Sequence, residues 1–202
     1  MHLLLATSNP GKAREFRRVL QPLGFEIESL ETFPDLPAAE ETESTFKGNA
    51  RLKARHYHQL TGLPALADDS GLEVDALGGR PGVRSSRLAD SDPERIRRLL
   101  EMLAREAPQR DSMRSARFVC ALCLVTPEKT WEVEGRVEGL IIDTPRGRHG
   151  FGYDPLFYFP PLDRTFAQIP PQTKNRISHR ADALKKLLAL LRQESAGPID
   201  QC

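Results

Sequence analysis

Apolar residues recur along the chain with two spacings, one typical of strands and one typical of helices. Short apolar or alternating runs predict strands at residues 2–6, 25–30, 63–67, 115–126, about 130–137, 139–143 and 156–159. Apolar residues three or four positions apart predict helices that begin near Ala13, Ser44, Ser91 and Ser178. Because strands and helices mix without strict alternation, we expect an α/β fold with a mixed central sheet and flanking helices.

Length and composition are those of an ordinary globular protein. The 202 residues are 39% hydrophobic and 28% charged, which suits a domain with a buried core and excludes global disorder. No apolar run approaches the roughly 18 residues that a membrane helix needs. The run at residues 2–6 is too short for the core of a signal peptide. We therefore expect a cytoplasmic protein that does not act at a membrane.

Acidic and basic residues balance over the whole chain but separate along it. There are 29 Lys and Arg against 28 Asp and Glu, and the formal net charge of +1 argues against nucleic acid as the partner. Residues 31–43 contain five acids and no base, and residues 64–77 contain four acids and no base. Basic residues gather at 80–87 and 174–186 instead. The ordinary interpretation of such charge runs is solvated surface, which does not account for acids that directly follow an apolar run.

The strongest candidate for a metal site is an acidic pair at the end of a predicted strand. Asp68 and Asp69 directly follow the apolar run 63–67, and Glu40 and Glu41 lie upstream. Open sheets place ligands at the carboxyl ends of strands, and adjacent carboxylates repel unless a cation offsets them. Mg²⁺ takes such oxygen ligands, and a carboxylate that is not fully committed to the metal can orient or deprotonate an attacking water. The alternative is a set of acids that cap a turn.

Three further segments suit a nucleotide. Thr7–Lys12 joins a predicted strand to a helix, where backbone N–H groups bind anions; a plain turn is the alternative. Phe151–Asp154 combines aromatic rings with glycine and suits stacking on a base; the alternative is a tight turn with packed rings. His179 and Arg180 fall in the first turn of the last helix, where cations oppose the helix dipole, which indicates a ligand with acceptors or negative charge.

The cysteines do not indicate a redox or metal site. Cys120 and Cys123 form a C-x-x-C within the apolar run 118–125. No second ligand pair accompanies them, so we interpret them as buried thiols in a strand.

Taken together and in order, these segments closely resemble the inosine triphosphate pyrophosphatase family, which acts on non-standard purine nucleoside triphosphates such as dITP and XTP. The matching segments are Ala6–Lys12, Glu40–Thr42, Thr45–Phe46, Asn49–Ala50, Leu63–Gly71, Gly78–Gly79, Pro81–Gly82, Gly150–Pro155, Lys174 and Ser178–Arg180. Separated motifs that all occur in family order are far more specific than any one of them. Arg84 and Leu88 depart from the pattern, since many members have tyrosines there.

The resemblance implies a fold of two lobes around a substrate cleft. It implies that residues 1–195 form a single catalytic domain and that residues 196–202 form a short C-terminal tail. It further implies a homodimer, a dependence on Mg²⁺, and hydrolysis of ITP, dITP and XTP to the monophosphate and pyrophosphate.

The resemblance also assigns roles to residues of this chain. Asp69 is the implied proton acceptor. The expected metal ligands are Glu40, Glu41, Asp68 and Asp69. The expected substrate-binding residues are Thr7, Ser8, Asn9, Pro10, Gly11, Lys12, Ser70, Phe151, Gly152, Tyr153, Asp154, Lys174, His179 and Arg180. Hydrogen-bond donors such as His179 and Arg180 favour the 6-oxo group of hypoxanthine over the amino group of adenine.

Two alternatives stay open at this point. One is a related pyrophosphatase that acts on other modified nucleotides. The other is a protein that binds a nucleotide or RNA without turnover, against which the presence of both Asp68 and Asp69 argues.

Overall fold

The computed structural model describes residues 2–106 and 114–195, and the predicted tail at 196–202 lies outside this part of the chain. The strands are β1 (His2–Leu5), β2 (Glu26–Ser29), β3 (Ala65–Val74), β4 (Ser115–Val125), β5 (Thr130–Ile141), β6 (Phe157–Phe159) and β7 (Arg164–Thr165). The helices are α1 (Pro10–Leu20), α2 (Phe46–Thr61), α3 (Asp92–Glu106), α4 (Pro171–Ile177) and α5 (His179–Ser195).

One mixed sheet runs through the described part of the molecule. Its strands lie in the order β2-β1-β3-β4-β5-β6-β7. β1 is parallel to both β2 and β3, whereas each neighbouring pair from β3 to β7 is antiparallel. The predicted α/β class, with a mixed central sheet and flanking helices, is therefore confirmed.

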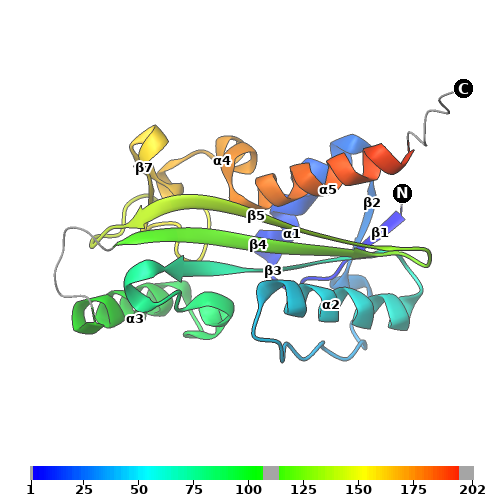
Figure 1. The fold of residues 1–202 in the computed structure, drawn as a ribbon, viewed down its shortest axis with the longest axis horizontal. Coiled ribbons are helices and arrows are strands. Elements are labelled where there is room, and N and C mark those ends of the chain that lie inside the picture. Colours follow the sequence, from blue (N-terminus) through cyan, green and yellow to red (C-terminus); the bar gives the residue numbers. More distant parts are fainter. Residues whose placement is uncertain (1, 107–113, 196–202) are drawn as a thin grey trace, which may run out of the picture.

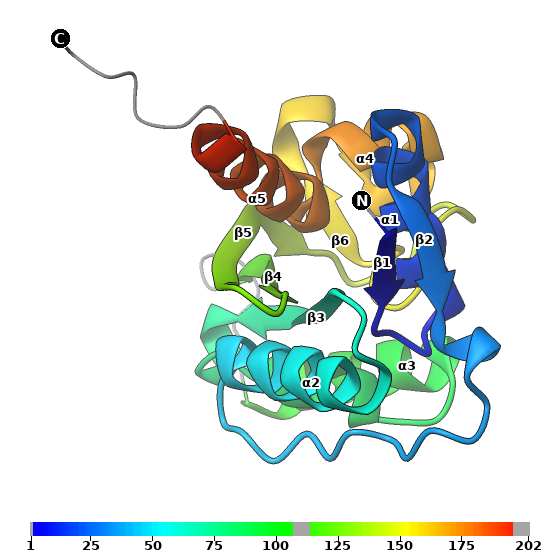
Figure 2. The same ribbon diagram turned by 90° about the vertical axis from the view of Figure 1, so that its right-hand side faces the viewer.

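Helices cover both faces of this sheet. Figures 1 and 2 show α1 and α5 on one face and α2 on the other. Because the side chains of a strand alternate between faces, Leu66 of β3 joins a buried cluster with Phe16 of α1 and Leu184 of α5. Its neighbours Ala65 and Ala67 join a different cluster, against α2. Consecutive residues of β3 therefore pack against different helices, and the same alternation applies to Asp68 and Asp69 further along the strand.

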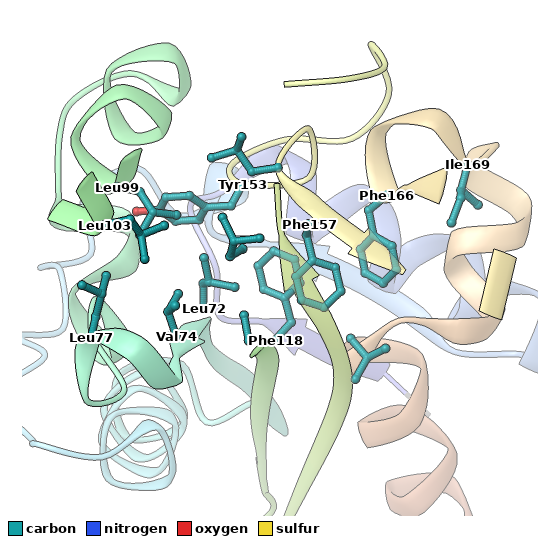
Figure 3. Packing of buried hydrophobic residues seen from close by; sticks show 14 residues of the cluster. Leu72, Val74, Leu77, Leu99, Leu103, Phe118, Tyr153, Phe157, Phe166 and Ile169 are labelled. Carbon is teal, nitrogen blue, oxygen red and sulfur yellow. The ribbon is translucent and has the colours of Figure 1, made fainter. Parts of the chain in front are cut away.

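A third buried cluster fills the other end of the long strands. Leu72 and Val74 of β3 pack there with Phe118 of β4 and with Leu99 and Leu103 of α3, and aromatic rings complete the cluster (Figure 3). β3, β4 and β5 are 10, 11 and 12 residues long. These three strands therefore connect all three clusters.

Two predicted strand boundaries are wrong. The sequence predicts that the strand at 63–67 ends before Asp68, whereas β3 continues to Val74 because β4 pairs with it residue by residue. The separate strands predicted at 130–137 and 139–143 are one strand, β5, for the same reason. The acidic pair thus lies inside a strand and not in the loop beyond it.

The helix starts differ from the predicted ones by a few residues. α1 begins at Pro10, before the predicted Ala13, because Asn9 caps it. Thr45, and not Ser44, caps α2 through a hydrogen bond from the Gly48 N–H group. The short elements α4 and β7 were not predicted.

Candidate active site

The candidate site lies where the backbone pairing along one edge of β3 is interrupted. The pairing of β1 with β3 ends at Leu5 and Leu66. Further along the same edge, at Leu72, β3 contacts the 3-10 segment η4 (Gly82–Arg87). The Leu72 N–H group donates a hydrogen bond to the Ser85 hydroxyl of η4 at 2.9 Å. Asp68, Asp69 and Ser70 occupy the stretch between these two contacts.

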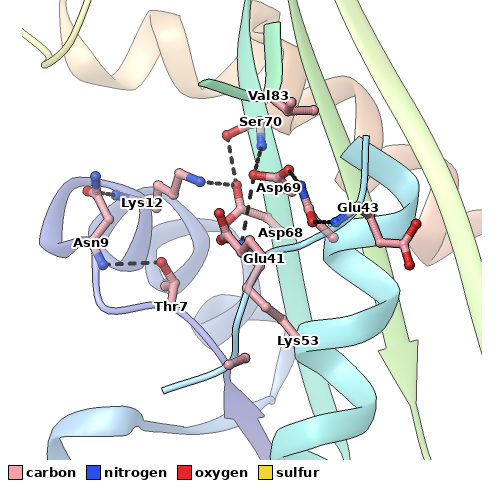
Figure 4. Close-up of polar contacts among 12 residues, drawn as sticks. Thr7, Asn9, Lys12, Glu41, Glu43, Lys53, Asp68, Asp69, Ser70 and Val83 are labelled. Carbon is pink, nitrogen blue, oxygen red and sulfur yellow. Dashed lines mark hydrogen bonds and ion pairs between the residues drawn. The ribbon is translucent and has the colours of Figure 1, made fainter. Parts of the chain in front are cut away.

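Asp68 is buried among cations on the side of the sheet that α1 and α5 cover. Its Oδ2 lies 3.1 Å from Lys12 Nζ and accepts a hydrogen bond from Ser70 Oγ at 2.9 Å (Figure 4). The same oxygen lies 3.6 Å from Arg180 Nε. Burial alone would raise the pKa of Asp68, but the charges of Lys12, Arg180 and Lys53 outweigh it and hold the pKa at about 2. Asp68 is therefore a fixed carboxylate that anchors cations.

Asp69 faces the opposite side of the sheet, towards α2. Asn49 Nδ2 donates to its Oδ2 at 3.0 Å, the Ser70 N–H group donates to its Oδ1 at 3.1 Å, and Lys53 Nζ is 3.9 Å from Oδ1. Burial raises the pKa of Asp69, and the nearby lysine charges offset only part of this effect. The pKa values of these adjacent carboxyl groups are therefore shifted in opposite directions, and Asp69 is the better base of the two.

Glu41 approaches Asp69 from the segment that precedes α2. Its Oε1 is 2.7 Å from Lys53 Nζ and its Oε2 is 3.2 Å from an Arg87 nitrogen. Burial opposes ionisation of Glu41, but Lys53 and further cations hold its pKa below the ordinary value. Lys53 therefore interacts with both carboxylates. Glu40, in contrast, is exposed.

The predicted metal ligands do not form a complete metal site by themselves. Across residues 2–106 and 114–195, no three His, Cys, Asp or Glu side chains lie close enough to hold a metal ion. The Asp68 Oδ1 atom is buried and has no hydrogen-bond partner in this part of the chain. Mg²⁺ often takes one or two carboxylates together with substrate phosphates and waters. The donor set of Glu41 and Asp69 fits such a shared site, while Asp68 faces the cations on the opposite side of β3.

The segment Thr7–Lys12 forms the predicted strand–loop–helix junction. Asn9 Oδ1 accepts from the N–H groups of Gly11 and Lys12 at 2.9 and 3.1 Å, and the Asn9 N–H group donates to Thr7 Oγ1 at 3.2 Å. The first turn of α1 contains no acidic residue. The positive end of the helix dipole and the Lys12 ammonium therefore act together on any anion bound here.

A pocket of about 260 Å³ beside this helix end brings together most of the predicted substrate residues. Those that line it are Asn9, Pro10, Gly11, Lys12, Ser70, Phe151, Gly152, Tyr153, Asp154, His179 and Arg180. Thr7, Ser8 and Lys174 do not line it. Ser8 is exposed, whereas Lys174 is buried with its Nζ 4.9 Å from the centre of the Phe151 ring. Lys174 therefore supports the pocket from behind.

His179 contributes an uncharged ring to this pocket. The ring stacks on Phe118, with centroids 4.8 Å apart and planes 15° from parallel. Burial lowers the pKa of His179 well below 6.5, and the charges of Arg180 and Lys174 lower it further. Its Nδ1 is buried without a hydrogen-bond partner among the described residues. The expectation of a cationic His179 is therefore wrong, and its neutral ring can donate or accept a hydrogen bond.

The charge of Arg180 is balanced inside the protein. Its guanidinium donates to Glu15 Oε2 at 3.0 Å and to Ser70 Oγ at 2.7 Å. Lys174 Nζ lies 3.0 Å from Glu15 Oε1 and 2.5 Å from Asp154 Oδ2. Because Glu15 offsets the unfavourable position of Arg180 in the first turn of α5, that position does not by itself require an anionic ligand.

Several charged residues of the site were not predicted from the sequence: Arg87, which pairs with Glu41, and Arg14, Asp92 and Arg95, which line the pocket. Glu15 and Lys53 were not predicted either, although the sequence contained a signal for these two. Each lies on a helix, one turn after a residue that belongs to a matching motif. Glu15 follows Lys12 by three positions, and Lys53 follows Asn49 by four. Residues at these spacings share a helix face, so a charged residue on the same face as a motif residue was the available signal.

The cysteines are buried thiols, as predicted. Cys120 and Cys123 are both unpaired and buried in β4. They belong to clusters on opposite faces of the sheet, and burial raises the pKa of Cys123 to about 12. Neither thiol is poised for redox or metal chemistry.

Comparisons with known proteins find relatives that match nearly the whole chain. The Ham1 family model matches residues 3–190. A protein named dITP/XTP pyrophosphatase from Exiguobacterium sp. is 50% identical over 94% of this chain and 96% of its own length. One of the same name from Bacillus licheniformis is 47% identical over 95% of this chain and 98% of its own length. A HAM1 protein structure from Coxiella burnetii has a TM-score of 0.85 and 45% identity and covers 96% of this chain and 99% of its own. None of the described helices is long and apolar enough to cross a membrane.

Proposed function

This chain belongs to the Ham1 family, and from that membership we propose that it hydrolyses ITP, dITP and XTP to the monophosphate and pyrophosphate. The relatives named dITP/XTP pyrophosphatase match it over nearly their whole length, which supports the same reaction here. The role of such an enzyme is to remove non-standard purine nucleotides from the nucleotide pool. The resemblance found in the sequence is confirmed.

The observation that carries the proposal is the difference between Asp68 and Asp69. One carboxylate is held ionised by Lys12 and Arg180, two residues that also line the pocket. The other has a raised pKa and lies on the side of Glu41 and Lys53. A single strand therefore supplies both a fixed anion that orients the cations and a base for water.

The reaction assigns one proton transfer to Asp69. The oxygen of a water molecule forms a bond to the α-phosphorus, the bond from that phosphorus to the bridging oxygen breaks, and its electron pair leaves with pyrophosphate. Asp69 accepts the proton of the water. Hydrogen bonds from Asn49 Nδ2 and the Ser70 N–H group hold the carboxylate in place while leaving lone pairs free.

We propose Mg²⁺ as the cofactor and Glu41 and Asp69 as its protein ligands. The ion would neutralise phosphate charge and stabilise the leaving pyrophosphate. Asp68 stays committed to Lys12 and Arg180, which fits a supporting role better than direct ligation. Glu40 is exposed, so we do not retain it among the ligands.

The pocket wall supports selection for a 6-oxo purine. Arg180 carries only donors, and the neutral ring of His179 can present an N–H group. Hypoxanthine and xanthine offer an acceptor at position 6, whereas adenine offers an amino donor that would leave these groups unpaired. The Phe151 ring provides an aromatic face beside the same pocket. Lys174 Nζ and Arg180 Cζ lie 4.9 and 5.2 Å from its centre.

The direct test incubates the protein with dITP, XTP, dATP and GTP in the presence of Mg²⁺ and detects pyrophosphate and phosphate separately. We expect pyrophosphate and the monophosphate from dITP and XTP. Release of phosphate with formation of a diphosphate would contradict the proposal, and so would binding of dITP without turnover.

The same assay tests Asp69. Asp69→Asn keeps the size of the side chain but removes the base, so we expect turnover to fall by about 10² to 10⁴-fold while the far-UV circular dichroism spectrum is unchanged. Glu73→Gln is the matched control, because Glu73 lies four positions along β3 on the same face and pairs with Arg117. Full activity of Asp69→Asn would remove Asp69 from the reaction.

The expected homodimer and cytoplasmic location stay proposals. The homodimer derives from the family resemblance stated above.

A further inference from the structure

Helix α5 meets β5 backbone to backbone at one glycine. A Cβ atom at Gly135 would lie 2.3 Å from the carbonyl oxygen of His179 and 2.3 Å from the amide nitrogen of Ala183. Both are main-chain atoms of α5, so no rotation of a side chain can make room for it. Glycine at this position is therefore what allows α5 to lie as close to the strand as it does.

Main-chain groups of β5 fix α5 along the strand as well. The Arg136 N–H group donates to Asp182 Oδ2 at 3.0 Å, and Lys186 Nζ donates to the Glu134 carbonyl at 2.8 Å. Asp182 and Lys186 are themselves 2.8 Å apart. β6 pairs with β5 only at residues 140–141, so α5 satisfies main-chain groups of β5 that β6 does not reach.

The contacts at Gly135 and Asp182 lie within about one helical turn of the pocket residues on α5. His179 and Arg180 precede Ala183 by four and three positions, and both line the pocket. A displacement of α5 at Gly135 would carry His179 away from its stack on Phe118 and Arg180 away from Glu15 and Ser70. The position of the pocket wall therefore depends on how α5 is seated on β5.

We propose that Gly135 and Asp182 are positioning residues for nucleobase discrimination: they hold the first turn of α5 at the distance and register that place His179 and Arg180 in the pocket. This inference rests on the proposed function. Neither residue lines the pocket, and each acts only through the helix. A misplacement of about 1 Å is enough to matter, because it can cost on the order of 10²-fold in rate.

The test measures kcat/KM for dITP and for dATP with each variant and compares the ratio of the two values. Loss of folded protein lowers both values equally and leaves the ratio unchanged, so the ratio responds to the pocket and not to stability. We expect Gly135→Ala to lower the dITP-to-dATP ratio by roughly tenfold. Asp182→Ala should lower it by about threefold, and Asp182→Asn, which keeps an acceptor for the Arg136 N–H group, should restore it to within about twofold.

Gly139→Ala is the matched control. Gly139 lies on the same face of the same strand, and a Cβ atom there would lie 2.5 Å from the Phe157 ring and 2.6 Å from the Tyr158 carbonyl, with no atom of α5 among its nearest contacts. We expect it to destabilise the protein while keeping the ratio within about twofold.

Each outcome decides the inference. An unchanged ratio in both Gly135→Ala and Asp182→Ala would overturn it, and so would an equal fall in Gly139→Ala. If Gly135→Ala does not fold, the Ala and Asn variants of Asp182 still test the inference, because this side chain is half-exposed and its replacement leaves the core intact. Failure of the wild-type protein to release pyrophosphate from dITP would contradict the proposed function instead, and that result is visible before any variant is compared.

Discussion

At the scale of single residues, environment matters more than residue type. Asp68 and Asp69 carry the same group, yet one has a pKa of about 2 and the other a raised pKa. The difference arises because consecutive side chains of β3 point to opposite faces, one to Lys12 and Arg180 and the other to Asn49. The sequence located both acids but not their partners, since these come from helices distant in the chain.

His179 gives a prediction for the pH dependence of stability. Its folded-state pKa is lowered, so the unfolded chain binds a proton below about pH 6.5 that the folded protein refuses. The free energy of unfolding should therefore fall as the pH drops from about 6.5 towards the lower folded-state pKa, by up to about 1.4 kcal/mol per pH unit for this group. Stability above pH 7 should be insensitive to it.

The comparison variant is His179→Phe, which retains a ring to stack on Phe118. Urea unfolding of the ligand-free protein between pH 5 and 8 should show a steeper loss of stability for wild type than for the variant. Parallel curves for the two proteins would show that His179 is not the group responsible. The other histidines are common to both proteins and cancel in this difference.

At the scale of elements, local signals located the long helices and strands, whereas tertiary contacts set their ends. The helix expected to begin near Ser91 was predicted correctly as α3, because a capping signal at its start coincides with an apolar stripe along it. β3 extends beyond its apolar run because β4 supplies pairing partners as far as Val74. α4 has seven residues and no distinct apolar stripe, so nothing in the sequence pattern indicated it.

Asp92 connects two elements that the sequence treats separately. Its Oδ2 accepts from the Gly152 N–H group at 2.7 Å, which ties the start of α3 to the loop that carries Phe151. We expect Asp92→Ala to free this loop, to raise the KM for dITP roughly five- to tenfold, and to reduce stability by about 1–2 kcal/mol. Steady-state kinetics and thermal unfolding measure the two effects.

Glu94→Ala is the control for this variant. Glu94 lies in the same first turn of α3, interacts with the same helix dipole, and pairs with Arg97 and Arg98 at the surface. It should lose a similar or smaller amount of stability at an unchanged KM. If both variants raise the KM equally, the effect belongs to α3 as a whole and not to the contact with Gly152.

At the scale of the whole molecule, the long strands unite the buried clusters. β3, β4 and β5 each contribute to the core at both ends of the sheet, so neither end has a sheet of its own. The family resemblance implied two lobes around a cleft, but residue patterns alone could not show that the same strands serve both.

We therefore expect the ligand-free protein to unfold in one cooperative transition. Differential scanning calorimetry should give a calorimetric enthalpy equal to the van't Hoff enthalpy within about 10%, as for a single cooperative domain. Two resolved transitions would show that the ends of the sheet unfold independently, contrary to one domain over residues 1–195.

The alternation of Asp68 and Asp69 on β3 has a consequence for how this segment can evolve. Insertion or deletion of one residue in β3 ahead of the pair would turn every later side chain to the opposite face. Asp69, the proposed proton acceptor, would then face Lys12 and Arg180, and Asp68 would face α2. We therefore expect the segment from Ala65 to Ser70 to tolerate some changes of side chain but no change of length, in contrast to the connections at the surface.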